Sequence, residues 1–345
     1  LSLVGSEMCI RDRIRAEHFL PALERGMSLH DAEIDAIASN NDDPTFGNVI
    51  EAYDAAGEML ARTELVFGML CAAENTPELQ ALQERAMPLL AAHYDRILLD
   101  ERLFARVKEL YDRREALDLD DVQLRLLEKT YRRFVRAGAL LDAGRKARLK
   151  EINGELALAA VKFGNNLLAE NNRFEMELTA DEMAGLPSDV QELAREKARE
   201  RGKKKDTGIF SLHKPSLIPF LTYSSDRGLR ERIYKAYLNR GNNGDEYDNK
   251  QLINDFIRLR TEKAHLLGYP SYAAYVVDDE MAGTTDAVYE LLEGVWTPAL
   301  ERAKGELSEL EELFRKDVPE GEFASWDWWY LSLIHISEPT RLRRI

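Results

Sequence analysis

The stretch "PTFGNVIEAYDAAGEMLARTELVFGML" (44–70) decides the fold class of this sequence. Alternating steps of three and four residues place eight of its positions on one stripe of an α-helix. These positions are Phe46, Val49, Tyr53, Ala56, Leu60, Thr63, Phe67 and Leu70. Pro44 and Thr45 supply a helix start after the loop-like run "NNDD". The pattern predicts one long amphipathic helix.

The same helical period continues through most of the chain. Further helices are expected at about 77–99, 100–115, 120–138, 142–170, 188–202, 226–240, 247–267, 271–279 and 285–316. Two capping boxes are predicted, one from Thr179 with Glu182 and one from Ser188 with Gln191. The stretch "PSLIPFLTYSSD" (215–226) is expected to be a loop or a short helical turn, and "RGNNGDE" (240–246) an exposed turn.

Two short segments are the best strand candidates. "RFEMEL" (173–178) alternates apolar and charged residues, and "GIFSL" (208–212) is short and mixed. They are expected to pair as a hairpin or small sheet with a helix between them. The predicted fold class is therefore all-α, mainly helical, with at most a small β-hairpin or sheet near 173–212.

Composition and charge exclude several classes of protein. The chain has 345 residues, 45% of them hydrophobic, which suffices for a sizeable core. No run of about 18 apolar residues predicts a transmembrane helix, and no signal peptide is visible, so no membrane partner is expected. The net charge of −15 argues against a nucleic-acid partner, because phosphate binding needs excess basic charge. The basic run at 194–205 is interpreted as a solvated helix end.

The search for catalytic and metal-binding motifs is negative. The six histidines are His18, His30, His93, His213, His265 and His335. No two of them lie four residues apart, so the sequence holds no HExxH zinc motif. It also lacks GxSxG, Walker A and GxGxxG motifs. No catalytic, cofactor-binding or metal-binding residue is therefore assigned.

The remaining candidates receive structural interpretations. His30, in "HDAE", is expected on a helix surface, and His265 near a helix C-terminus. The acidic clusters at 117–121 and 276–280 lack EF-hand spacing and are read as solvated loops or helix starts. Cys71 is read as a buried, inert thiol. The aromatic run "WDWWY" (326–330) is read as a packing anchor, with a ligand platform as the alternative.

Both ends of the chain differ from the rest. Residues 1–13 and 331–345 each begin Leu-Ser-Leu and show no helical or strand pattern. Both resemble translated sequencing-library adaptor, so we expect them to be artefacts and exclude them from fold reasoning. Without these two segments the net charge is −17, and Cys71 is the one remaining cysteine because Cys9 lies in the first segment.

Several segments, in order, resemble the M3 family of zinc oligopeptidases, nearest to its peptidyl-dipeptidase and oligopeptidase A members. The stretch at 44–70 is followed by "TYRRFVRAGALL", "VKFGNNLL" and "PFLTYSSDRGLRERIYKAYLNRG". The clearest match is "LRTEKAHLLGYPSYAAYVVDDEMAGTTDAV" (259–288), followed by the spaced "WDWWY". The resemblance covers residues 14–330.

The resemblance implies the helical N-terminal part of a deeply clefted metallopeptidase that hydrolyses short peptides and releases C-terminal dipeptides. The family binds one Zn²⁺ through HExxH and a third ligand, all expected downstream of Tyr330, so the chain itself is expected to be inactive and to bind no zinc. Exposed apolar helix faces are then expected, with poor solubility or self-association of the fragment. A cytoplasmic location is expected, with the periplasm as the alternative. The competing hypothesis is a non-enzymatic helical scaffold or interaction protein. Endopeptidase and dipeptidase specificity are not separated by this sequence.

Overall fold

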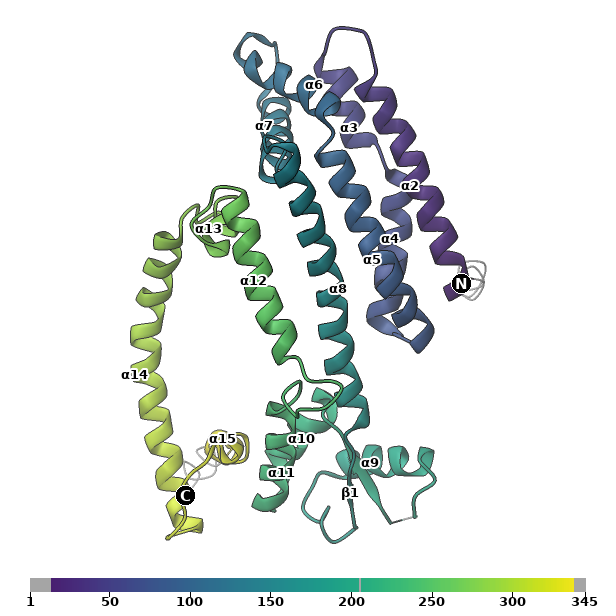
Figure 1. Ribbon diagram of the computed structural model, residues 1–345. Helices are drawn as coiled ribbons and strands as arrows, with labels where there is room; N and C mark the ends of the chain where they lie inside the picture. The colour runs from purple at the N-terminus through teal and green to yellow at the C-terminus, as the bar shows by residue number, and fades with distance from the viewer. Residues whose placement is uncertain (1–13, 205, 338–345) are drawn as a thin grey trace, which may run out of the picture. The chain divides into compact units, whose positions relative to one another are not determined.

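The computed structural model describes residues 14–204 and 206–337, and the side chains only up to Ser332. Its elements are α2 (Ala16–Ala38), η1 (Phe46–Glu51), α3 (Ala52–Ala55), α4 (Glu58–Ala73), α5 (Pro77–Leu98), α6 (Glu101–Asp112), η2 (Arg114–Ala116), α7 (Asp121–Arg136), α8 (Ala143–Arg173), β1 (Met176–Leu178), α9 (Ser188–Glu200), β2 (Gly208–Phe210), α10 (Lys214–Tyr223), α11 (Arg227–Leu238), α12 (Lys250–Leu266), α13 (Tyr272–Val277), α14 (Thr285–Asp317), η3 (Ser325–Asp327) and α15 (Trp328–Ser337). The predicted, mainly helical fold class is confirmed (Figure 1).

The chain divides into two compact units. The first comprises residues 1–163 and 252–275, and the second comprises 164–251 and 276–345, so the division falls inside α8 and near the start of α12. No helix among the described residues is long and apolar enough to cross a membrane.

The first unit is a set of packed helices with two apolar clusters. One cluster joins α2, η1, α6 and α7 around Val49, Leu103 and Phe134, which are fully buried. The other joins α2, α4 and α5 around Leu23 and Leu60. Cys71 lies in this second cluster, so its predicted burial is confirmed, and burial raises the pKa of its thiol. Cys9 lies outside the described residues.

The second unit contains the expected small sheet. β1 and β2 pair antiparallel, with Met176 opposite Phe210 and Leu178 opposite Gly208. α9 connects them, and the sheet packs with α9, α10 and α11 around the buried Phe220 and Ile233. A separate apolar cluster joins α14 to α15 through Leu310, Phe314 and Leu331.

The single helix predicted from residue 46 onward is wrong. It is interrupted at Gly57, which adopts a left-handed conformation with φ of 80°. The Gly57 N–H donates to Glu33 Oε2 at 2.7 Å, and a Cβ on Gly57 would lie 2.9 Å from the His30 ring. Side chains from α2 therefore fix the break, which periodicity within the segment does not reveal.

We expect Gly57→Ala to lower the free energy of unfolding by about 2 kcal/mol or more, because a non-glycine residue is strained at this φ and its methyl group meets His30. Gly68→Ala is the matched control. Gly68 lies inside α4 with nothing within 4 Å of its added Cβ, so alanine there should stabilise by about 0.5–1 kcal/mol. Urea denaturation of both variants measures the difference, and equal effects would contradict the prediction.

Two other local predictions need correction, and one helix was not predicted. Residues 214–223 form a ten-residue helix, longer than the expected loop or short helical turn, because Leu217, Phe220 and Leu221 are buried on one face. The Ser188–Gln191 box does not form, since Pro187 is the N-cap and the Gln191 amide donates to the Leu186 carbonyl. The Thr179–Glu182 capping box is confirmed by its two reciprocal hydrogen bonds, and turns follow it. No range was predicted for α2, although His30 was expected on a helix.

A further correction concerns the C-terminal segment. The helix α15 continues past Tyr330 to Ser337, where no helical pattern was predicted, and Leu331 is buried against α14. The first helix-breaking residue after Tyr330 is Pro339. A proline disfavours the helical conformation in the residue before it. Residues 1–13 and 338–345 of the adaptor-like ends lie outside the described residues, and neither proposed boundary is tested.

Candidate functional site

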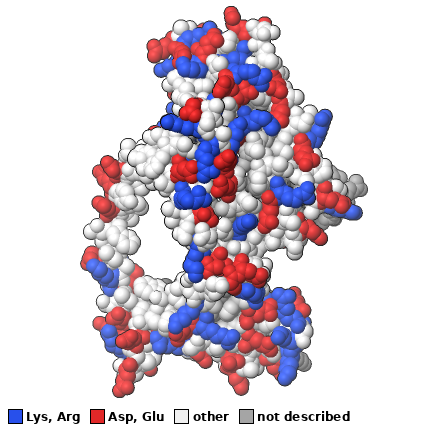
Figure 2. All heavy atoms as spheres, in the orientation of Figure 1, with Lys and Arg blue, Asp and Glu red and all other residues white. Residues whose placement is uncertain are grey.

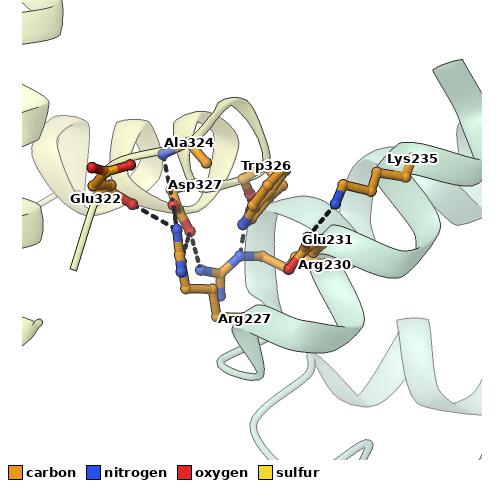
Figure 3. A network of polar contacts seen from close by, with 8 residues as sticks. All are labelled: Arg227, Arg230, Glu231, Lys235, Glu322, Ala324, Trp326 and Asp327. Atoms are coloured by element: carbon orange, nitrogen blue, oxygen red, sulfur yellow. Dashed lines mark hydrogen bonds and ion pairs between the residues drawn. The ribbon is translucent and has the colours of Figure 1, made fainter.

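The WDWWY segment is held by a fully buried carboxylate. Asp327 lies at the end of η3 and has no solvent exposure. Arg227 Nε donates to both of its carboxylate oxygens at 3.1 Å, and Arg230 Nη2 donates to Oδ1 at 2.9 Å. The Ala324 N–H donates to Oδ2 at 3.0 Å (Figure 3). Both arginines come from α11, three residues apart and therefore on one helix face.

The two arginines also bind the backbone around this carboxylate. Arg230, 4% exposed, donates to the Ser224 carbonyl at 2.7 Å and to the Trp326 carbonyl at 3.2 Å. Arg227 donates to the Glu322 carbonyl at 2.7 Å (Figure 3). Hydrogen bonds that involve an ionised group are stronger than those between neutral groups. A buried guanidinium requires such bonds because they replace its lost hydration. The network therefore fixes the start of α15 on α11.

Aromatic rings complete the network. The Arg230 guanidinium lies 4.3 Å from the Tyr330 ring centroid, and Lys235 lies 5.1 Å from that of Trp326. Tyr234 contacts both Trp326 and Trp329. The Trp326 indole N–H is buried and has no acceptor among the described residues, although such groups usually have one when buried. Trp329 is 40% exposed. These contacts favour the packing anchor over the ligand platform.

The network positions a helix and offers no group for acid–base chemistry. Asp327 accepts hydrogen bonds on both oxygens and is closed to solvent, so it meets no substrate. The sequence search missed Arg227 and Arg230. The i, i+3 arginine spacing in "DRGLRER" was a usable signal, but periodicity does not indicate which distant acidic residue they pair with.

A second polar cluster lies inside the first unit, between α2 and α5. His30 Nδ1 and His93 Nε2 are 3.0 Å apart, and Asp31 Oδ1 lies 3.2 Å from His93 Nδ1. Arg96 Nη2 donates to Asp31. His30 is 8% exposed and His93 1%, so the helix-surface interpretation of His30 is wrong: the ring faces a partner 63 residues away in sequence.

Burial determines the protonation of this pair. It lowers the pKa of His93 to about 4, against the opposing charge of Asp31, and His30 and Arg96 lower it further. Burial likewise lowers the pKa of His30, against Glu33 and Asp31. Both rings are therefore neutral near pH 7 and share one hydrogen bond. Because they are enclosed by helices, they serve packing rather than substrate chemistry.

The other predicted positions behave mostly as expected. His265 is exposed near the C-terminus of α12. Asp120, in the acidic cluster 117–121, caps α7 by accepting from the Gln123 N–H. Basic residues at the end of α9 are exposed and paired, as in the ion pairs Arg201–Glu175 and Lys203–Glu177. Basic and acidic side chains are interspersed on the face drawn in Figure 2. The His335 side chain lies outside the described residues.

No group of three or more His, Cys, Asp or Glu side chains in the described residues could hold a metal ion. A protein zinc site needs three or four such ligands. The donor set that the structure describes therefore does not fit zinc, and we derive no metal-dependent step from these residues.

Comparison with known proteins identifies the class. The model of the family "Peptidase family M3" matches residues 220–339, which include α11, α14 and the Asp327 network. The chain resembles this family over the matched region, and it is similar to dipeptidyl carboxypeptidases and oligopeptidases A over most of its length. It is 36% identical to the dipeptidyl carboxypeptidase of Escherichia coli over 320 residues, which is 92% of this chain and 46% of the relative.

Oligopeptidases are similar over the same region. The chain is 26% identical to oligopeptidase A of Salmonella typhimurium, over 92% of this chain and 47% of the relative. It is 29% identical to an organellar oligopeptidase A of Arabidopsis thaliana, over 92% of this chain and 40% of the relative. The chain thus spans about half the length of the curated relatives it matches.

Proposed function

We propose that the complete protein is a zinc-dependent metallopeptidase acting on short peptides, and that residues 14–330 form its helical N-terminal part. The single observation that carries this proposal is the 36% identity to a dipeptidyl carboxypeptidase across 92% of the chain. By that likeness, the complete protein releases dipeptides from substrate C-termini. The cytoplasm is its proposed location, with the periplasm as the alternative.

The chain's own part in this function is positional. The Asp327 network holds α15 on α11 within the region that matches the family model. Family chemistry requires a zinc-bound water and a general base. The chain has neither an HExxH motif nor a described metal-ligand group to supply them. We therefore assign the catalytic residues to the portion of the relatives that this chain does not span.

We expect the purified chain to cleave no peptide in a zinc-dependent manner. The test incubates the full 345-residue chain with a quenched fluorescent peptide, with and without Zn²⁺, and measures bound zinc by elemental analysis. A chimera continuing from Tyr330 into the remaining part of the E. coli relative is the positive arm, and it should release C-terminal dipeptides. Stoichiometric zinc and cleavage by the chain alone would overturn the assignment. An inactive chimera that folds and binds no zinc would favour the scaffold hypothesis.

A further inference from the structure

One face of α14 is apolar along the N-terminal half of the helix. At about 100° per residue, Val288, Tyr289, Leu291, Leu292, Val295, Trp296 and Ala299 fall within an arc of about 160°. Glu290, Glu293, Thr297 and Glu301 lie on the opposite side. An arc this wide is typical of a helix that packs against a core, because a fully solvated helix needs no apolar stripe.

The N-terminal half of this face is uncovered. Leu291 is 69% exposed, Trp296 64% and Val295 60%. Tyr289 and Leu292 are also among the exposed large apolar side chains. We call these five residues the open α14 face. Five large apolar side chains adjacent on one helix form a contiguous patch, which marks an interaction site more often than scattered single residues do.

The same arc is already a packing surface at the other end of α14. Leu310 and Phe314 fall on the helical positions of Leu292 and Trp296. There they are 4% exposed and pack with Leu331 of α15. α15 lies beside the C-terminal end of α14 in Figure 1. The same side of α14 is therefore covered near its C-terminus, where α15 packs on it, and open in the N-terminal half. Arg302 and Glu306, which form an ion pair, lie on this side between the two parts.

We propose that the open α14 face is the docking surface for the polypeptide that follows α15 in the complete peptidase. This inference rests on the proposed function, since the occupant is the part of the relatives that this chain does not span. Two observations point to it: the face lies on the same side of α14 as the α14–α15 interface, and the relatives extend to about twice the matched length.

A tethered occupant also has a thermodynamic advantage over other candidates. A segment joined directly to α15 meets the face at an effective concentration in the millimolar range, which a second copy of the chain does not reach at ordinary concentrations. A membrane is disfavoured as an occupant because the opposite side of the same helical turns carries Glu290 and Glu293, and anionic lipid headgroups repel acidic residues.

The test compares the full chain with the chimera that continues into the remaining part of the E. coli relative. Hydrogen exchange at residues 285–300, measured by mass spectrometry, should slow by about tenfold or more in the chimera, which corresponds to about 1.4 kcal/mol of added protection. Equal exchange in the two proteins would overturn the proposal. A monomeric chimera is expected in light scattering, and slowed exchange only in a chimera dimer would assign the face to a second copy and also overturn it.

Paired variants separate docking from helix stability. Leu291→Glu with Val295→Glu places two charges on the open face, and Gly294→Glu with Thr297→Glu places two on the opposite face. A Cβ at Gly294 meets nothing within 4 Å. In the chimera, only the first pair should restore fast exchange and lower the melting temperature. In the chain alone, neither pair should lower it. Equal behaviour of the two pairs in the chimera would overturn the proposal.

The exchange readout also keeps this inference distinct from the proposed function. Protection of the open face in a chimera without peptidase activity would support docking and count against the function. An active chimera in which the open α14 face exchanges as fast as in the chain alone would support the proposed function and count against docking.

Discussion

Asp327→Asn should destabilise the second unit by about 3–5 kcal/mol, the largest effect we expect from any single substitution in this chain. The carboxylate is fully buried, and Arg230 beside it is 4% exposed. Removing the negative charge leaves a guanidinium that has been taken out of water without its counter-ion. Breaking a buried pair from one side costs more than the pair contributes, because the remaining charge keeps its desolvation penalty.

Urea denaturation followed by tryptophan fluorescence measures this effect, since Trp326, Trp328 and Trp329 adjoin the network. Asp317→Asn, at the exposed C-terminus of α14, is the matched control and should change stability by less than about 0.5 kcal/mol. The double variant Arg230→Met with Asp327→Leu removes the two buried charges and leaves Arg227, which is 36% exposed and keeps access to water. It should recover part of the loss. A cost of Asp327→Asn below about 1 kcal/mol would mean that water reaches the network.

The second large effect is a loss of stability in mild acid caused by the His30–His93 pair. The pKa of both rings is lowered in the folded state, and that of His93 falls to about 4, from about 6.5 when unfolded. A histidine that is buried in its neutral form contributes fully to the free energy of unfolding when the pH is above the pKa that the residue has in the unfolded state. As the pH falls below about 6.5 the unfolded state takes up the proton first, so stability decreases until the folded pKa is reached.

For His93 the interval of about 2.5 pH units corresponds to about 3 kcal/mol at 1.36 kcal/mol per unit. Unfolding free energies of the wild type and His93→Gln between pH 7 and pH 4.5 isolate this contribution, because other titrating groups act in both proteins. The variant should show the shallower pH dependence. His265→Gln, at an exposed site on α12, should keep the wild-type slope. Parallel curves for the wild type and His93→Gln would refute this assignment.

Local patterns predicted most helices because their hydrogen bonds join residues four apart. α5, α7, α12 and α14 lie close to their expected ranges, and the small sheet formed from the two expected segments. Two of the errors share one cause. Gly57 is held in a left-handed conformation by Glu33, and His30 is buried against His93, so in both cases the deciding partner lies on another element.

The candidate site was less predictable than the helices. The sequence singled out WDWWY as an anchor, and the packing of its aromatic residues supports that interpretation. The sequence did not indicate which residues fix the WDWWY segment in place. Asp327 pairs with arginines about a hundred positions away, and "DRGLRER" is one of many charged runs in a chain with 32% charged residues.

The sequence by itself determined the helical class, the two strand segments, the absence of an HExxH motif and the family resemblance. Each depends on residue type and on spacing within one segment. Only the tertiary structure decided which charges are buried together, which histidine is enclosed, where the long stripe after residue 46 breaks, and which part of the α14 face is covered. Those outcomes depend on desolvation and contact between distant segments, and proximity of that kind exists only once the chain has folded.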